Sequence, residues 1–111
     1  MAKYEKTISG NLEQVAHRLQ QKILSSVLSM NLVDESHYEH EDFKVIVQVY
    51  DKYFYRNKSR ASLTLTLVNH NNDIFVSAIG AGGGQGIIFN FSLGAEDEMM
   101  DVVKDCIEDI D

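Results

Sequence analysis

The chain has 111 residues, which is the size of one domain, and we expect a single domain over residues 1–111. Apolar residues make up 44% and charged residues 24%, a composition that supports a core and excludes an intrinsically disordered chain. The net charge of −7 argues against a nucleic-acid partner, and no apolar run approaches the roughly 18 residues of a membrane span.

The first third of the chain predicts a strand over 3–9, a turn at 9–11 and a helix over 12–30. Asn11 is a favourable N-cap for this helix, and Asn31 can end it. Apolar side chains recur along it at three- and four-residue steps, at Leu12, Val15, Ala16, Leu19, Ile23, Val27 and Met30.

From residue 32 the period of the pattern is two, which is typical of strands. A polar strand is predicted over 32–39, a turn at 41–42, and a stronger strand from residue 43. In this strand Lys44 and Gln48 point to one face of the sheet. The apolar residues between and beside them point to the other face, namely Phe43, Val45, Val47 and Val49. In the next, leucines alternate with Ser62, Thr64 and Thr66. We predict that four of these apolar residues lie in the core: Val45, Val47, Leu63 and Leu65.

The last third predicts a strand over 74–79, a glycine-rich segment over 80–86, a strand over 87–93 and a helix over 95–110. The helix has an apolar stripe at Met99, Val102, Val103, Cys106, Ile107 and Ile110. Short turns between the middle strands indicate antiparallel neighbours. We therefore predict an α+β two-layer sandwich, with an antiparallel sheet of five to six strands and two helices in the order β-α-β-β-β-β-β-α.

Three stretches of the sequence are distinctive: Ala-Lys-Tyr-Glu-Lys-Thr-Ile-Ser-Gly-Asn at 2–11, Val-Gln-Val-Tyr-Asp-Lys-Tyr-Phe-Tyr at 47–55, and Ser-Ala-Ile at 77–79 leading into the glycine-rich segment. In these stretches the chain resembles a small family of uncharacterised bacterial proteins, a domain of unknown function found mainly in Gram-positive bacteria. The resemblance spans nearly the whole chain and supports the predicted fold. It implies no activity and no catalytic residues.

The glycine-rich segment is the most unusual feature, and we interpret its glycines as a contact surface for a neighbouring element, a partner chain or a ligand: Gly80, Gly82, Gly83, Gly84 and Gly86. A bulge or wide loop fits the segment equally well. A phosphate cradle does not fit, because no Lys-Ser or Lys-Thr pair follows the last glycine and no helix is predicted to begin there.

Two further stretches carry chemistry-bearing side chains. Residues 50–60 combine four aromatic residues with Arg56, Lys58 and Arg60, a combination that can hold single-stranded nucleic acid, although a solvated turn is the preferred interpretation. Residues 35–42 combine His37 and His40 with acids. On a strand these two histidines point to opposite faces, so we predict a solvated hairpin and no metal site.

No catalytic constellation and no cofactor site is evident, so an enzyme is the less favoured class. We predict a non-enzymatic interaction module that forms a homo-oligomer. The alternative is a small-molecule-binding domain with its ligand between the sheet and the long helix. The lone Cys106 excludes an internal disulfide, and no signal peptide pattern opens the sequence, so the cytoplasm is the expected location.

Overall fold

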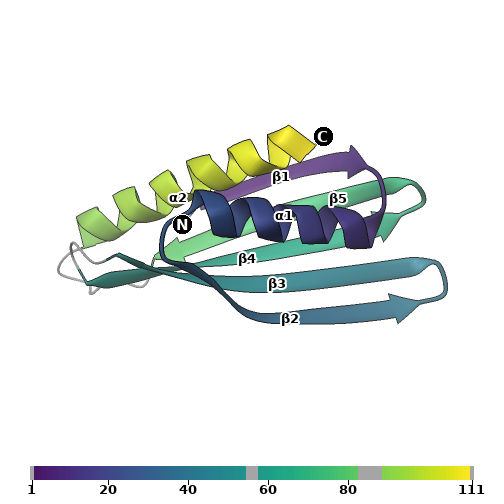
Figure 1. Ribbon diagram of the computed structural model, residues 1–111, viewed down its shortest axis with the longest axis horizontal. Helices are drawn as coiled ribbons and strands as arrows, with labels where there is room; N and C mark the ends of the chain where they lie inside the picture. The colour runs from purple at the N-terminus through teal and green to yellow at the C-terminus, as the bar shows by residue number, and fades with distance from the viewer. Residues whose placement is uncertain (1, 55–57, 83–88, 111) are drawn as a thin grey trace.

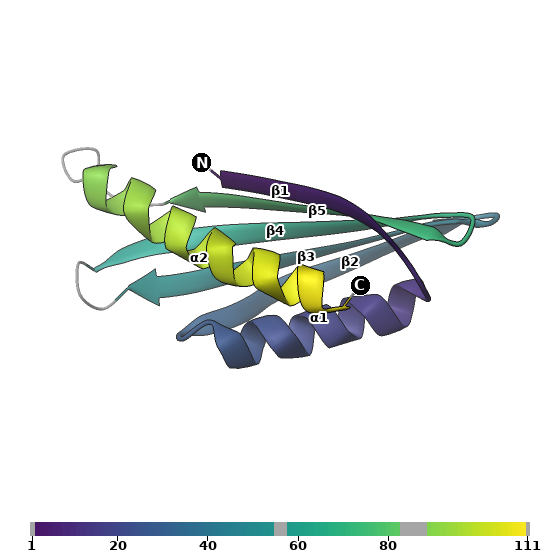
Figure 2. The same cartoon turned by 90° about the horizontal axis from the view of Figure 1, so that it is seen from above.

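The computed structural model describes residues 2–54, 58–82 and 89–110, and in it two helices lie on one face of an antiparallel sheet (Figure 1, Figure 2). The elements in chain order are β1 (Ala2–Ser9), α1 (Leu12–Ser26), β2 (Met30–His40), β3 (Phe43–Phe54), β4 (Ser59–His70), β5 (Asp73–Gly82) and α2 (Phe89–Ile110). The predicted α+β class is confirmed. Over the residues described, neither helix is long and apolar enough to cross a membrane.

The five strands lie in the order β1-β5-β4-β3-β2, so the first strand of the chain pairs with the last. All four pairings are antiparallel. Because β5 has β1 on one side and β4 on the other, it has no free edge for a following strand. The strand predicted over 87–93 is therefore wrong for residues 89–93, which begin α2, while 87–88 lie outside the described residues.

Helix α1 begins as predicted but ends four residues earlier. The side chain of Asn11 accepts a hydrogen bond from the backbone N–H of Gln14 at 3.0 Å, which confirms it as the N-cap. At the other end, the N–H of Val27 still bonds to the carbonyl of Ile23, and the chain then turns into β2. Ser29 in this turn has a φ of +61°, so the predicted extension of the helix to residue 30 is wrong.

The core lies between the two helices and one face of the sheet. All residues of the predicted apolar stripe are buried, although the last two, Val27 and Met30, lie after the end of α1. Val103, Cys106 and Ile107 of α2 meet the same core. The sheet contributes residues of alternating positions, namely Ile46, Tyr50, Leu63, Leu65, Leu67, Ile74, Val76 and Ala78.

The prediction of core residues is correct for Leu63 and Leu65 and wrong for Val45 and Val47. The alternation in β3 is as expected, but the helices cover the face that carries Ile46, Gln48 and Tyr50. The valines point to the opposite side of the sheet.

The acidic end of α2 is held by basic and aromatic side chains of β1 and α1. Glu108 accepts hydrogen bonds from the hydroxyl of Tyr4 and from the ammonium of Lys6, and Lys22 lies 3.8 Å from Asp109. These contacts compensate for carboxylates at the negative end of the helix dipole.

Candidate protein interface

The face of the sheet that points away from the helices is uncovered in the described part of the chain (Figure 2). We call it the open face. Four large apolar residues of this face are exposed, namely Tyr38, Phe43, Phe75 and Ile79. Four valines of the same face are half-buried, namely Val45, Val47, Val49 and Val68. An antiparallel sheet with one solvated face normally places polar residues there. A β3 strand that is apolar on both faces is typical of a sheet that is covered on both sides.

Strand register arranges the centre of the open face in three rows that run across the sheet. The apolar row contains Tyr38, Val45, Val68, Phe75 and Thr7 in neighbouring strands from β2 to β1. The middle row contains Ser36, Val47, Thr66, Ser77 and Glu5. The third row contains Asp34, Val49, Thr64, Ile79 and Lys3.

Charged groups of the open face lie on its margins. Lys3 and Glu5 are on β1 and Asp34 is on β2, the two outer strands of the sheet. Arg60 binds Asp51 at one end of the strands. An apolar and hydroxyl-bearing centre with a charged rim is the composition of a protein–protein interface.

The β2 edge of the sheet is less suited to pairing with another chain than the open face is. β2 carries the charged residues Asp34, Glu35 and Glu39, and its register shifts between Leu32 and Asp34, as at a β-bulge. Charges and bulges on an edge strand oppose the addition of another strand. The open face is therefore a better candidate for self-association than the β2 edge of the sheet.

The glycines singled out in the sequence do not form one surface in the described part of the chain. Gly80 is buried under α2: a Cβ there would lie 3.1 Å from Cε of Met99 and 3.2 Å from Cγ of Met100. Gly82 ends β5 and is exposed. The remaining three, Gly83, Gly84 and Gly86, lie outside the described residues. Because Gly80 has no side chain, α2 can pack closely against β5 at this position.

The basic and aromatic residues of 50–60 are divided between the two faces of the sheet. Tyr50 is fully buried in the core, and Lys52 lies over the ring of Phe54 at 4.7 Å. On the open face, Arg60 lies over the ring of Tyr53 at 5.4 Å. Tyr55 and Arg56 lie outside the described residues. The described part of this stretch therefore presents no continuous aromatic platform.

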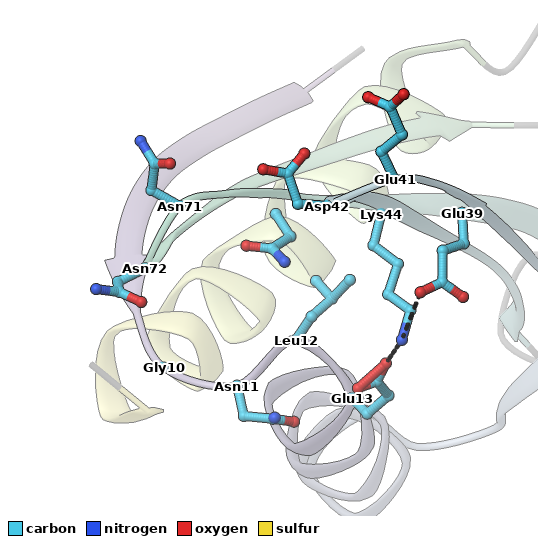
Figure 3. A pocket seen from close by; sticks show the side chains of 11 residues that line it. Gly10, Asn11, Leu12, Glu13, Glu39, Glu41, Asp42, Lys44, Asn71 and Asn72 are labelled. Carbon is cyan, nitrogen blue, oxygen red and sulfur yellow. Dashed lines mark hydrogen bonds and ion pairs between the residues drawn. The ribbon is translucent and has the colours of Figure 1, made fainter.

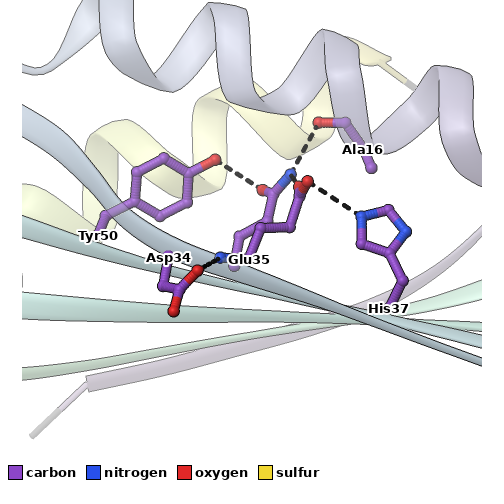
Figure 4. Close-up of polar contacts among 6 residues, drawn as sticks. Ala16, Asp34, Glu35, His37 and Tyr50 are labelled. Carbon is purple, nitrogen blue, oxygen red and sulfur yellow. Dashed lines mark hydrogen bonds and ion pairs between the residues drawn. The ribbon is translucent and has the colours of Figure 1, made fainter.

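A buried polar network joins β2 and β3 to α1 (Figure 4). Gln48 is fully buried, and its amide nitrogen donates to a carboxylate oxygen of Glu35 at 2.6 Å and to the carbonyl of Ala16 at 3.4 Å. The hydroxyl of Tyr50 donates to the amide oxygen of Gln48 at 2.6 Å. His37 lies 3.0 Å from the other oxygen of Glu35. Every polar group of Gln48 thus has a partner, which makes its burial tolerable.

This network also fixes protonation states. The bond from His37, together with that from Gln48, holds the pKa of Glu35 below its usual value, so the carboxylate stays ionised. Burial, and the nearby charge of Glu35, raise the pKa of Tyr50, so the phenol stays neutral and remains a donor. These states suit a structural role, in which the network fixes the position of α1 on the sheet.

A polar pocket of about 410 Å³ lies at the end of the sheet, where the β1–α1 connection meets the β2–β3 and β4–β5 turns (Figure 3). Lys44 projects into it, bonds to Glu13 and lies 3.8 Å from Glu39. The hydrogen bond from Lys44 lowers the pKa of Glu13. Glu41 and Asp42 also line the pocket. The ammonium group of Lys44 is thus paired with carboxylates of its own chain. The pocket is formed where three loops of the fold meet.

Other reactive groups do not converge on a site. Cys106 is buried, and desolvation raises the pKa of its thiol, which disfavours the nucleophilic thiolate. Within residues 2–54, 58–82 and 89–110, no three histidine, cysteine or acidic side chains gather where a metal ion could be held. Sequence reasoning missed the open face, although Val45, Val47 and Val49 beside Ile46 in one strand were its signal.

Comparison with known proteins gives one family match and several distant structural similarities. A family model described as "Family of unknown function (DUF6054)" matches residues 1–111. Comparison with curated proteins finds no significant match.

Among solved structures, TTHA0849 from Thermus thermophilus is similar, with 13% identity, a TM-score of 0.42 and coverage of 96% of this chain and 93% of that one. The hypothetical protein jhp0584 from Helicobacter pylori shows 6% identity, a TM-score of 0.47 and coverage of 95% and 83%. The di-domain ARO/CYC StfQ from the steffimycin biosynthetic pathway shows 9% identity, a TM-score of 0.37 and coverage of 97% and 44%.

Proposed function

Because the chain belongs to the DUF6054 family, a family of unknown function, we propose its role from its own surface: it is a non-enzymatic interaction module that self-associates through the open face. The observation that supports this proposal is the band of apolar residues on a sheet face that the two helices leave bare. Large exposed apolar patches with polar rims are typical of interaction sites.

The size of the open face supports a stable contact. β3 and β4 have 12 residues each, and the sheet has five strands. At about 3.3 Å per residue and about 4.8 Å between strands, the face measures about 20 by 40 Å. This is about the 800 Å² that each partner contributes to an interface of standard size.

A second copy of the chain is the occupant we propose. Both copies then present the same flat face, with small and β-branched side chains in the middle and larger rings toward the margins, so neither needs a complementary groove. Two sheets pack face to face about 10 Å apart in this way in β-sandwich proteins.

We further propose the cytoplasm as the location of the protein, because its single Cys106 is buried and can form no disulfide within the chain.

The alternative of a ligand between the sheet and α1 finds no support in the packing there. Leu19 and Ile23 of α1 and Ile46 of β3 are fully buried in that layer. The remaining polar groups, around Gln48, bond to one another.

Replacing Phe75 by lysine is expected to dissociate the oligomer. Phe75 lies in the apolar row with 39% of its surface exposed, so the substitution places a charge in the proposed contact without opening the core. Loss of this aromatic contact should weaken association by about 30-fold, which corresponds to about 2 kcal/mol. Sedimentation velocity and native mass spectrometry over a concentration series measure this change.

Leu24→Lys is the matched control, because Leu24 is 37% exposed but lies on α1, on the other side of the molecule. This variant should keep the mass of the wild type, and both variants should keep its melting temperature. A wild-type protein that is monomeric at its highest soluble concentration would contradict the proposal, and so would an oligomer that survives Phe75→Lys.

A further inference from the structure

The margins of the open face carry a pattern of charge that can select how two copies stack. Lys3 on β1 and Asp34 on β2 stand at opposite ends of the third row. Neither side chain makes an ion pair within the described part of the chain; Asp34 bonds only to the adjacent backbone N–H of Glu35. Glu5, in the middle row, is held by the hydroxyl of Ser77 at 3.0 Å. One free positive and one free negative charge thus flank the same row.

We infer that two copies stack with a twofold axis between the sheets and parallel to β4, so that Lys3 of each copy pairs with Asp34 of the other; this rests on the proposed function. β4 is the middle strand of the order β1-β5-β4-β3-β2. Such an axis places β4 over itself, β5 over β3 and β1 over β2, and every row lies over the same row of the second copy with its ends exchanged. Two pairs of opposite charge follow.

The same axis matches the apolar groups. In the apolar row, Phe75 of one copy lies over Val45 of the other, and Val68 lies over its own counterpart. In the third row, Ile79 lies over Val49. Aligned sheets cross at about 30°, which displaces the outer strands by only a few ångströms, a gap that a flexible lysine side chain can bridge.

An axis that crosses the strands at the middle or third row gives poorer pairings. If it passes through the middle row, Glu5 lies opposite Glu5 of the second copy. If it passes through the third row, Lys3 lies opposite Lys3 and Asp34 opposite Asp34. If it passes between these rows, Asp51 lies against Val45. Like charges in contact and a carboxylate against an apolar residue both oppose association.

The test is a charge-reversal cycle on the full chain, with Lys3→Asp and Asp34→Lys. Each single variant turns both attractive pairs of the dimer into repulsive ones, and its dissociation constant should rise by about tenfold or more at low salt. The double variant restores opposite charges and should recover the affinity of the wild type. An equimolar mixture of the two single variants should form heterodimers in preference to either homodimer, as measured by native mass spectrometry.

Arg18→Asp on α1 and Asp101→Lys on α2 make the same charge changes on exposed positions of the helix side, and they should leave the dissociation constant unchanged. Thermal melts confirm that each variant is folded. A dimer that Phe75→Lys dissociates but that shows no coupling between Lys3 and Asp34 overturns this arrangement while leaving the proposed function in place. A wild-type protein without any dimer overturns both.

Discussion

Replacing Leu65 by alanine is expected to lower the free energy of unfolding by about 2–5 kcal/mol. Leu65 is fully buried in the middle of β4, under the helices, and a truncated side chain leaves a cavity that the surrounding sheet cannot fill. The measurement is urea unfolding followed by circular dichroism. It should be made in the Phe75→Lys background, because association would otherwise make stability depend on concentration.

Val47→Thr in the same background is the informative comparison. Val47 belongs to the open face, where a hydroxyl stays accessible to water, so we expect a change within about 0.5 kcal/mol. If Val47 lay in a core, the buried hydroxyl would cost about 1–3 kcal/mol. A large loss in Val47→Thr with a small one in Leu65→Ala would mean that the helices cover the other face of the sheet.

Gln48→Leu is expected to destabilise the fold by about 1–3 kcal/mol, although leucine is apolar and of similar size. The reason is the hydroxyl of Tyr50, which donates to Gln48 and is buried at the same place. Leucine offers no acceptor, so the Tyr50 hydroxyl loses the hydrogen-bond partner that it has in the wild type. A buried donor without a partner lowers the stability of the folded state. Urea unfolding of the variant measures the loss.

The double variant Gln48→Leu/Tyr50→Phe separates this cause from poor packing. Removing both partners leaves no unpaired hydroxyl, so the double variant should recover most of the stability that Gln48→Leu loses. Tyr50→Phe alone is the second arm of the cycle. Losses that simply add would show that the hydrogen bond between these two residues carries no coupling energy.

The helices were largely predictable because their signals are local. The apolar stripe of α1 and the N-cap at Asn11 depend only on neighbours within a few turns, and the structure confirms both. The end of α1 was not predictable in the same way. The chain must turn to enter β2, and the ammonium of Lys52, far along the sequence, bonds to the carbonyl of Leu28 in that turn.

The strand expected over 87–93 shows how a distant pairing overrides a local pattern. Phe89, Phe91 and Leu93 alternate with polar residues, and five residues of such alternation fit a strand as well as the start of a helix. A strand that formed a hairpin with β5 would need a free edge of β5 beside it. β1 occupies that edge, and this pairing joins the two ends of the sheet-forming region, which no local window of sequence reveals.

The sequence alone determined the α+β class, the α1 stripe and the alternation of β3, because each follows from the period of apolar residues along one element. It could not determine which face of the sheet the helices cover, since β3 is apolar on both sides and Gln48 looked like a solvent-facing residue. Tertiary structure decided this by supplying buried partners for Gln48 from β2 and α1. The valines were thereby left uncovered, and the candidate interface is their face of the sheet.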